Sequence, residues 1–86
     1  MRLDKFLQMS GVISRRTRAK EACDRGYVVL NGRTAKASTE VAPGQTLLVR
    51  LGGRELTFEV LSVPSRPVRK ADRDQVVRLL GNETTF

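Results

Sequence analysis

The residues of this sequence that are best suited to chemistry are basic side chains gathered near its beginning. Residues 1–25 hold seven arginines and lysines against three acidic residues, and Arg15, Arg16 and Arg18 crowd at the start of a predicted helix. Guanidinium groups match phosphate oxygens and guanine edges, and free N–H groups at a helix start also attract phosphate. Because cations at this end oppose the helix dipole, their placement favours a ligand over the alternative of a merely solvated charged face.

The charge of the whole chain also indicates a polyanionic partner. The 86 residues carry a formal net charge of +7 and a pI near 10.8, which points most often to nucleic acid and less often to an acidic membrane surface. The sequence has no apolar signal core at its start and no stretch that approaches a membrane span. We therefore expect a cytoplasmic protein with no membrane partner.

The aromatic residues bear on the kind of nucleic acid. Only four are present, and Phe6 and Phe58 fall on predicted apolar faces, which leaves no platform of stacked rings. This disfavours single-strand binders and favours phosphate and shape recognition of structured RNA. Duplex DNA stays open, although helix-turn-helix proteins normally have a third helix where this chain turns to strands.

Catalysis and metal binding have little support in the sequence. With no histidine and one cysteine, Cys23, the chain offers no zinc site, disulfide framework or histidine-based chemistry. Its carboxylates are scattered without a pair at acid/base spacing, and Gly52-Gly53 predicts a hairpin turn rather than a phosphate loop. We expect no enzyme, no metal and no cofactor, and we interpret Cys23 as a small core residue.

The basic residues are positioned by a predicted pair of helices. The first helix has an apolar face with i, i+3, i+4 spacing, made by Leu3, Phe6 and Leu7. Gly11 interrupts it, and Ser14 is the candidate N-cap of a second helix from about Arg15 to Arg25. This second helix buries only small side chains, those of Ala19, Ala22 and Cys23. A tight helix pair follows, with Gly26 at the expected C-terminal cap.

The following segment is predicted as strands. Residues 28–30 lead into Asn31-Gly32, a strong hairpin signal, and residues 33–36 return. Alternating apolar residues predict two more strands near 47–51 and 56–60. The predicted fold class is α+β, with two packed N-terminal helices on a small, mostly antiparallel sheet.

The composition changes after residue 63, where prolines precede a charged stretch. We assign residues 1–63 to one domain and residues 64–86 to a charged C-terminal tail. The tail is predicted to hold a short helix from about Ala71 to Leu80 and a frayed end over 82–86. The helix signal is the apolar spacing of Val76, Val77 and Leu80.

The order of residues in five segments resembles the S4 RNA-binding domain over about residues 1–51. The segments are Arg2-Leu3-Asp4-Lys5-Phe6-Leu7, Ser14-Arg15-Arg16-Thr17-Arg18-Ala19-Lys20, Gly26-Tyr27-Val28-Val29-Leu30-Asn31-Gly32, Lys36-Ala37-Ser38 and Val41-Ala42-Pro43-Gly44-Gln45. The resemblance implies two helices packed against a small sheet, with RNA bound on the helix face. It assigns RNA contacts to Arg2 and Arg16 first. The supporting RNA-binding patch is Lys5, Arg15, Arg18, Lys20 and Lys36.

Among S4 proteins, the chain looks like the stand-alone members, and in size, opening and tail it resembles the RqcP (YabO) family of bacterial ribosome-associated quality-control factors. That resemblance implies binding to a 50S ribosomal subunit blocked by peptidyl-tRNA, with contacts to the tRNA and 23S rRNA. It also implies an RqcH-like partner that adds C-terminal alanine tails to the nascent chain. We expect a monomer that helps elongation without catalysis.

Some features depart from this family pattern, and other functions stay open. Gly11 and Ser14 stand where many relatives have basic residues, and the tail from Pro64 onward matches little. One alternative is a heat-shock-type factor that rescues 50S subunits carrying peptidyl-tRNA, although that type typically has a longer basic extension. Others are an RNA-delivery subunit for a separate enzyme and a nucleoid-type DNA protein.

Overall fold

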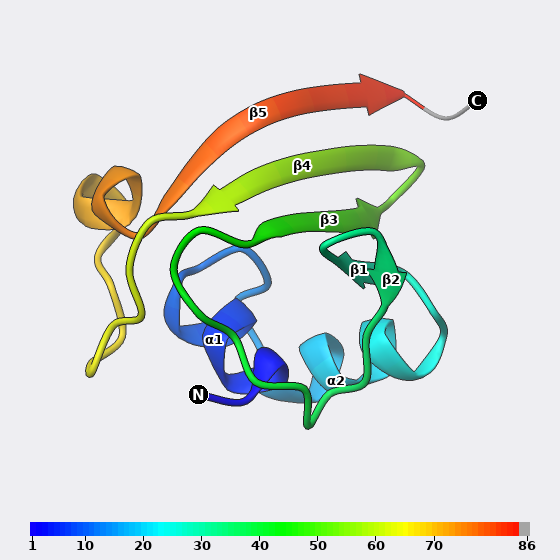
Figure 1. Cartoon of the computed structure of the whole chain (residues 1–86), viewed down its shortest axis with the longest axis horizontal. Coiled ribbons are helices and arrows are strands. Elements are labelled where there is room, and N and C mark those ends of the chain that lie inside the picture. Colours follow the sequence, from blue (N-terminus) through cyan, green and yellow to red (C-terminus); the bar gives the residue numbers. More distant parts are fainter. Residues whose placement is uncertain (85–86) are drawn as a thin grey trace.

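A computed structural model describes residues 1–84 as two α-helices and a five-stranded sheet, with the helices on one side of the sheet (Figure 1). The elements in chain order are α1 Leu3–Met9, α2 Arg16–Asp24, β1 Val28–Leu30, β2 Arg33–Thr34, β3 Thr46–Leu51, β4 Arg54–Val60, the 3-10 helix η1 Lys70–Gln75, and β5 Val77–Thr84. Within the described residues, no helix combines the length and the apolar character needed to cross a membrane.

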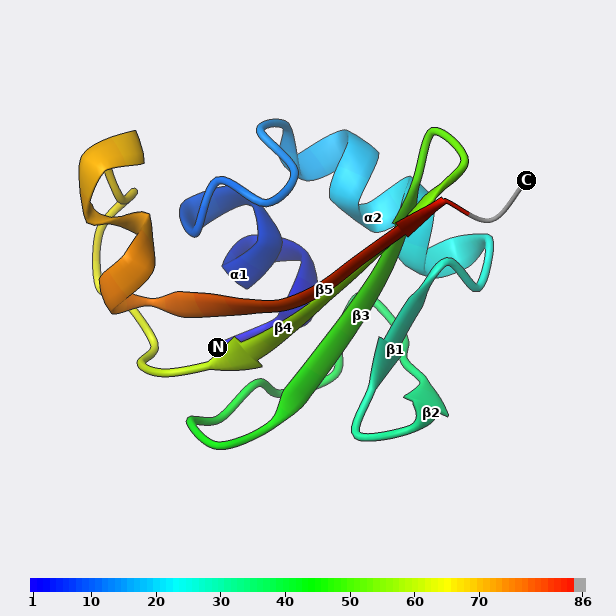
Figure 2. The same ribbon diagram turned by 90° about the horizontal axis from the view of Figure 1, so that it is seen from above.

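The sheet has the strand order β2-β1-β3-β4-β5, and all neighbouring strands are antiparallel (Figure 2). The β1–β2 hairpin turns through two residues, since Leu30 pairs with Arg33. Asn31 and Gly32 have φ values of 51° and 79°, as a type I′ turn requires. The predicted α+β class and the hairpin are confirmed, although the regular return strand covers only Arg33–Thr34.

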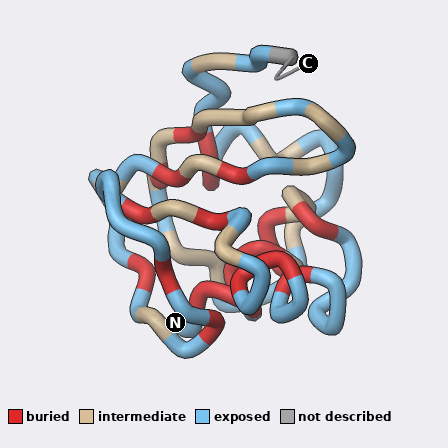
Figure 3. The backbone as a smooth tube through the Cα atoms, turned by 90° about the vertical axis from the view of Figure 1, so that its right-hand side faces the viewer, coloured by how far each residue is buried: buried red, intermediate tan, exposed pale blue. Residues whose placement is uncertain are grey.

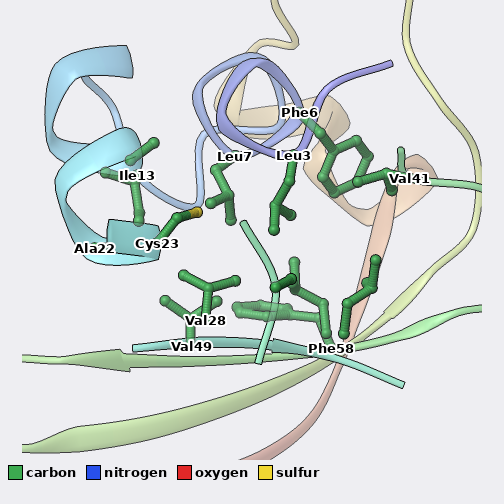
Figure 4. Packing of buried hydrophobic residues seen from close by; sticks show 14 of the residues in the cluster. Leu3, Phe6, Leu7, Ile13, Ala22, Cys23, Val28, Val41, Val49 and Phe58 are labelled. Carbon is green, nitrogen blue, oxygen red and sulfur yellow. The ribbon is translucent and has the colours of Figure 1, made fainter. Parts of the chain in front are cut away.

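The core lies between the helices and the inner face of the sheet. The α1 side chains of Leu3, Phe6 and Leu7 are fully buried, as their spacing predicts. Figure 4 shows Leu3 and Leu7 pointing toward Val28, Val49 and Phe58 of the sheet, while Phe6 lies beside Val41. The small residues of α2 are buried too, which lets this helix lie close to the sheet. Figure 3 shows that the buried segments lie between the helices and the sheet, whereas the edge strand β5 is largely exposed.

The two ends of α2 differ from each other in how they are capped. Ser14 does not cap the helix: the N-cap is Arg15, which makes no side-chain cap hydrogen bond. At the other end, Gly26 N–H donates to the Cys23 carbonyl and Tyr27 N–H to the Ala22 carbonyl, the pair of bonds of a Schellman motif. The predicted cap at Gly26 is confirmed, and the predicted N-cap at Ser14 is wrong.

The predicted helix over 71–80 is also wrong. A 3-10 helix covers Lys70–Gln75, and Val77–Thr84 forms strand β5, which pairs with β4 from Val60 to Arg54. The free edge of β4 offers a ladder of backbone hydrogen bonds, and this long-range pairing outweighs a weak local helical spacing. Residues 82–84 belong to this strand rather than to a frayed end, and residues 85–86 lie outside the described part. The domain boundary at residue 63 stays a prediction.

Candidate nucleic-acid interface

A buried carboxylate links the start of α1 to the start of α2. The Asp4 side chain is only 3% exposed and lies between Arg2 and Arg16. Its Oδ1 accepts hydrogen bonds from Arg2 Nε at 3.2 Å and from the Lys5 backbone N–H at 2.8 Å, and its Oδ2 accepts from Arg2 Nη2 at 3.3 Å. Arg16 Nε lies 3.5 Å from Oδ2. We call Arg2, Asp4 and Arg16 the Asp4 site.

The surroundings of Asp4 keep this carboxylate ionised. Burial alone would raise its pKa, but the hydrogen bond from Arg2, the backbone N–H of Lys5 and the charges of Arg16 and Arg2 outweigh burial. The pKa of Asp4 is therefore held below its ordinary value of 3.8. At neutral pH the Asp4 site is one carboxylate between two cations, with positive charge in excess.

Asp4 holds the two arginines in place and leaves N–H donors of both available to a ligand. Their side chains are 48% and 50% exposed, although the carboxylate between them is buried. A guanidinium carries five N–H donors in a rigid fork, and Asp4 engages only part of each fork. Oriented, half-exposed guanidiniums are suited to phosphate oxygens, which accept paired hydrogen bonds from Arg.

Two lysines face a hollow beside the Asp4 site. This hollow, of about 560 Å³, lies between α2 and residues 34–38, and Arg2, Lys20 and Lys36 line it. Two backbone hydrogen bonds hold the loop that contains residues 34–38 against α1. Leu3 N–H donates to the Thr39 carbonyl at 2.8 Å, and Asp4 N–H donates to the Ala37 carbonyl at 3.2 Å. The first N–H groups of α1 thus place Lys36 near Arg2. We call this hollow with its three cations the basic groove.

The seven residues of the predicted patch lie in different surroundings. Four of its members gather at the Asp4 site and the basic groove: Arg2, Arg16, Lys20 and Lys36. Arg18 lines a separate hollow on the other side of α2. Lys5 and Arg15 are exposed and line neither hollow. The RNA contacts of all seven residues stay a prediction.

Asp4 was missed as a site residue by sequence reasoning, which counted it among scattered carboxylates. The signal was present in the spacing, because Asp4 borders the apolar face that Leu3 and Leu7 form on the same helix. A carboxylate at the edge of a buried helix face is expected to find a cationic partner. Two arginines nearby, Arg2 and Arg16, supply it.

The C-terminal segment, for which no role was predicted, holds the loop that leads into α2. Val68 N–H donates to the Met9 carbonyl at 2.8 Å, and Arg73 Nη2 donates to the Gly11 carbonyl at 2.9 Å. Gly11 has φ +80°, and a Cβ placed on it would lie 2.9 Å from Arg73 Nη2. We call these two contacts the C-terminal clasp.

Cys23 belongs to the hydrophobic core between the helices and the sheet. Cys23 is 4% exposed, and burial, together with the charges of Asp4 and Asp24, raises its pKa to about 11. Its interpretation as a core residue is confirmed, since a thiol with such a pKa is largely protonated at neutral pH. No cluster of metal-ligating side chains occurs in residues 1–84.

Comparison with known proteins shows a family model and several proteins to which this chain is similar in sequence. The S4 domain family model matches residues 1–47. The "RQC P-site tRNA stabilizing factor" of Halalkalibacterium halodurans is 47% identical over 83 residues, which cover 96% of this chain and 93% of that protein. The protein of the same name from Bacillus subtilis is 53% identical over 60 residues, 70% of either chain.

Solved structures share the fold. The trimeric structure of Vibrio cholerae heat shock protein 15 aligns with a TM-score of 0.86 and 28% identity, over 92% of this chain and 80% of that one. The solution structure of the hypothetical protein HP1423 aligns with a TM-score of 0.79 and 36% identity, over 96% of this chain and all of that one. The helix pair and its sheet are therefore an arrangement known from experiment.

Proposed function

The chain belongs to the S4 domain family, together with the RQC P-site tRNA stabilizing factors, and we propose that it too binds P-site tRNA in ribosome-associated quality control. The predicted resemblance is confirmed by the family match over residues 1–47 and by relatives that cover nearly the whole chain. The observation that carries the proposal is the Asp4 site beside the basic groove. It gathers cations from both helices and the 34–38 loop on one face.

In finer detail, we propose that the protein binds a 50S subunit blocked by peptidyl-tRNA and contacts both that tRNA and 23S rRNA. An RqcH-like protein would add alanine residues to the nascent chain while this factor holds the tRNA between rounds. Support comes from the similarity to the RQC P-site tRNA stabilizing factors and from the half-exposed guanidiniums that Asp4 holds beside the basic groove. Work at the ribosome would place the protein in the cytoplasm.

The proposed role is binding without catalysis. The described residues supply positioned guanidinium and ammonium groups, which orient phosphates. In the proposed mechanism the ribosome forms the peptide bond, and the Asp4 site fixes the tRNA or rRNA backbone through its two arginines. The basic groove adds Lys20 and Lys36 as further charge.

The proposal is tested by removing one guanidinium at a time. Arg2→Ala and Arg16→Ala should reduce co-sedimentation with 50S particles carrying peptidyl-tRNA about tenfold or more, since a bidentate contact is worth about 1–3 kcal/mol. Each phosphate that is no longer neutralised should also lower the slope of log affinity against log salt by about 0.7–0.9. Arg78→Ala is the matched control, because Arg78 lies on β5 and pairs with Glu59.

Either result decides the proposal. If both alanine variants co-sediment as well as wild type, the Asp4 site is not the ribosome-binding surface. Unfolding curves for the variants separate weaker binding from a loss of folding, and the half-exposed positions of both arginines predict folded variants.

A heat-shock-type rescue factor is the second candidate, favoured by the TM-score of 0.86 to heat shock protein 15. The same basic surface serves either role. Purification from gently lysed cells distinguishes them: the quality-control role requires an RqcH-like protein on the recovered 50S particles, and the rescue role does not.

A further inference from the structure

A second hollow lies on the side of α2 opposite to the basic groove. It has a volume of about 500 Å³ and lies between α2, the end of the α1–α2 loop and strand β3. Its lining includes the apolar residues Val12, Ile13 and Leu51, the aromatic Tyr27, and the charged residues Arg18, Glu21 and Arg25. None of these residues belongs to the Asp4 site or the basic groove.

Tyr27 is the one exposed aromatic ring among residues 1–84. Its exposed fraction is 42%, whereas Phe6 and Phe58 are buried. The backbone of Tyr27 is fixed on both sides: its N–H donates to the Ala22 carbonyl at 2.9 Å, and its carbonyl accepts from Arg50 N–H at 2.9 Å. The backbone that carries the ring is therefore held in place, so that a stacking partner need not order this part of the main chain.

The charges around the ring favour an anion-bearing ligand. Arg25 is paired with Glu21 at 2.9 Å, but Arg18 forms no ion pair with any described residue. The hollow is thus lined by apolar side chains, one half-exposed aromatic residue and one unpaired guanidinium. This set matches a nucleotide, whose base stacks on aromatic side chains and whose phosphate accepts from Arg.

We propose that this hollow binds one unpaired nucleotide of RNA, with its base against Tyr27 and its phosphate at Arg18. The inference rests on the proposed RNA-binding function and extends it, because α2 separates the hollow from Arg16 and Lys20. An RNA whose backbone lies on the Asp4 site and crosses α2 reaches both sides of the helix. A fully paired duplex keeps its base faces stacked and leaves the Tyr27 hollow empty, so the protein selects helices that adjoin an unpaired base.

The test compares two RNA hairpins that differ in one feature. Both stems are closed by the same non-nucleotide linker, so that neither hairpin has unpaired loop bases. One hairpin ends blunt, and the other has the same stem with a short 3′ extension of unpaired adenosines. Tyr27→Ala should weaken binding of the extended hairpin about fivefold to a hundredfold, the range of base–aromatic stacking, and leave the blunt hairpin unchanged. Tyr27→Phe keeps the ring and should bind as wild type. Leu79→Ala is the matched control, because Leu79 is also exposed but lies on β5.

A spectroscopic signal separates stacking from a general loss of affinity. With 2-aminopurine in the extension, wild type and Tyr27→Phe should quench the base fluorescence on binding, and Tyr27→Ala should not. Equal binding and equal quenching by wild type and Tyr27→Ala would overturn the nucleotide site. Wild type that binds neither hairpin would instead overturn the RNA-binding function itself. Arg16→Ala should weaken both hairpins, which marks the Asp4 site as the shared contact.

Discussion

The Asp4 site and the C-terminal clasp hold the same helix pair by different means. The Asp4 site joins α1 to α2 through one buried carboxylate and two half-exposed arginines that lie close in the sequence. The clasp holds the α1–α2 loop through a bond from Arg73 to Gly11, 62 residues apart. The first contact leaves cationic groups open to a ligand, whereas the second buries its guanidinium Nε without a described acceptor.

This difference indicates that the Asp4 site serves ligand binding and that the C-terminal clasp serves the stability of the fold. Contacts among half-exposed charges contribute little to folding but determine where guanidiniums point. A long-range bond to a backbone carbonyl contributes to folding, and it lies outside the Asp4 site and the basic groove. Changes at the clasp should therefore lower the free energy of unfolding, and changes at the Asp4 site should alter RNA recognition more than stability.

The largest expected effect is at Gly11. Gly11→Ala should lower the free energy of unfolding by about 2–5 kcal/mol, because an L side chain at positive φ costs about 1–2 kcal/mol and loss of the Arg73 bond adds about 1–3 kcal/mol. Gly44→Ala is the matched control: Gly44 has φ +91° with nothing within 4 Å of an added Cβ. Gly44→Ala should therefore lower the free energy of unfolding only by the cost of a positive φ, about 1–2 kcal/mol. Urea unfolding measures both.

A double substitution sharpens this prediction. In an Arg73→Ala background, the cost of Gly11→Ala should fall to that of Gly44→Ala, since the clashing guanidinium is gone. An unchanged cost in that background would show that Arg73 does not hold the loop.

At the Asp4 site, Asp4→Asn should change recognition more than folding. We expect a loss of about 1–2 kcal/mol in unfolding free energy, because the charged hydrogen bonds go to half-exposed partners. The positive charge rises while the orientation of Arg2 and Arg16 is lost. The ratio of affinity for 50S particles carrying peptidyl-tRNA to affinity for an unrelated RNA duplex should therefore fall about tenfold. A ratio equal to that of wild type would mean that Asp4 does not orient the arginines.

The helix pair, the hairpin and the cationic cluster were predictable because their signals are local. The spacing of Leu3, Phe6 and Leu7 and the Asn31-Gly32 turn each lie within a few residues. Strand β5 was not predictable in this way, because its partner β4 is distant in the sequence. The spacing of Val76, Val77 and Leu80 indicated a helix instead, because these apolar residues recur at i, i+1 and i+4.

The candidate site was predicted in residue type but not in arrangement. Helical periodicity alone places Lys20 one turn beyond Arg16 and turns Arg18 to the other side, about 200° round the axis. Spacing along α2 therefore already separates Arg18 from Arg16 and Lys20, and the RNA contacts of all seven residues stay a prediction. The burial of Asp4 and the reach of Arg73 to Gly11 depend on how the chain packs, and no local pattern encodes the second contact.

The smallest expected effect is the pH dependence of the Asp4 contribution. Because the folded-state pKa of Asp4 lies below 3.8, its ordinary value, its ionisation stabilises the fold fully at pH values above that ordinary value. The stabilisation is lost as pH falls through the folded-state pKa. The difference in unfolding free energy between wild type and Asp4→Asn should thus stay constant from neutral pH to about pH 5 and shrink in more acidic solution. Urea unfolding across this range measures it. If the difference in unfolding free energy between wild type and Asp4→Asn grew on acidification, the arginines would not stabilise the Asp4 carboxylate. Binding and stability would then not be divided between the Asp4 site and the C-terminal clasp as their geometry indicates.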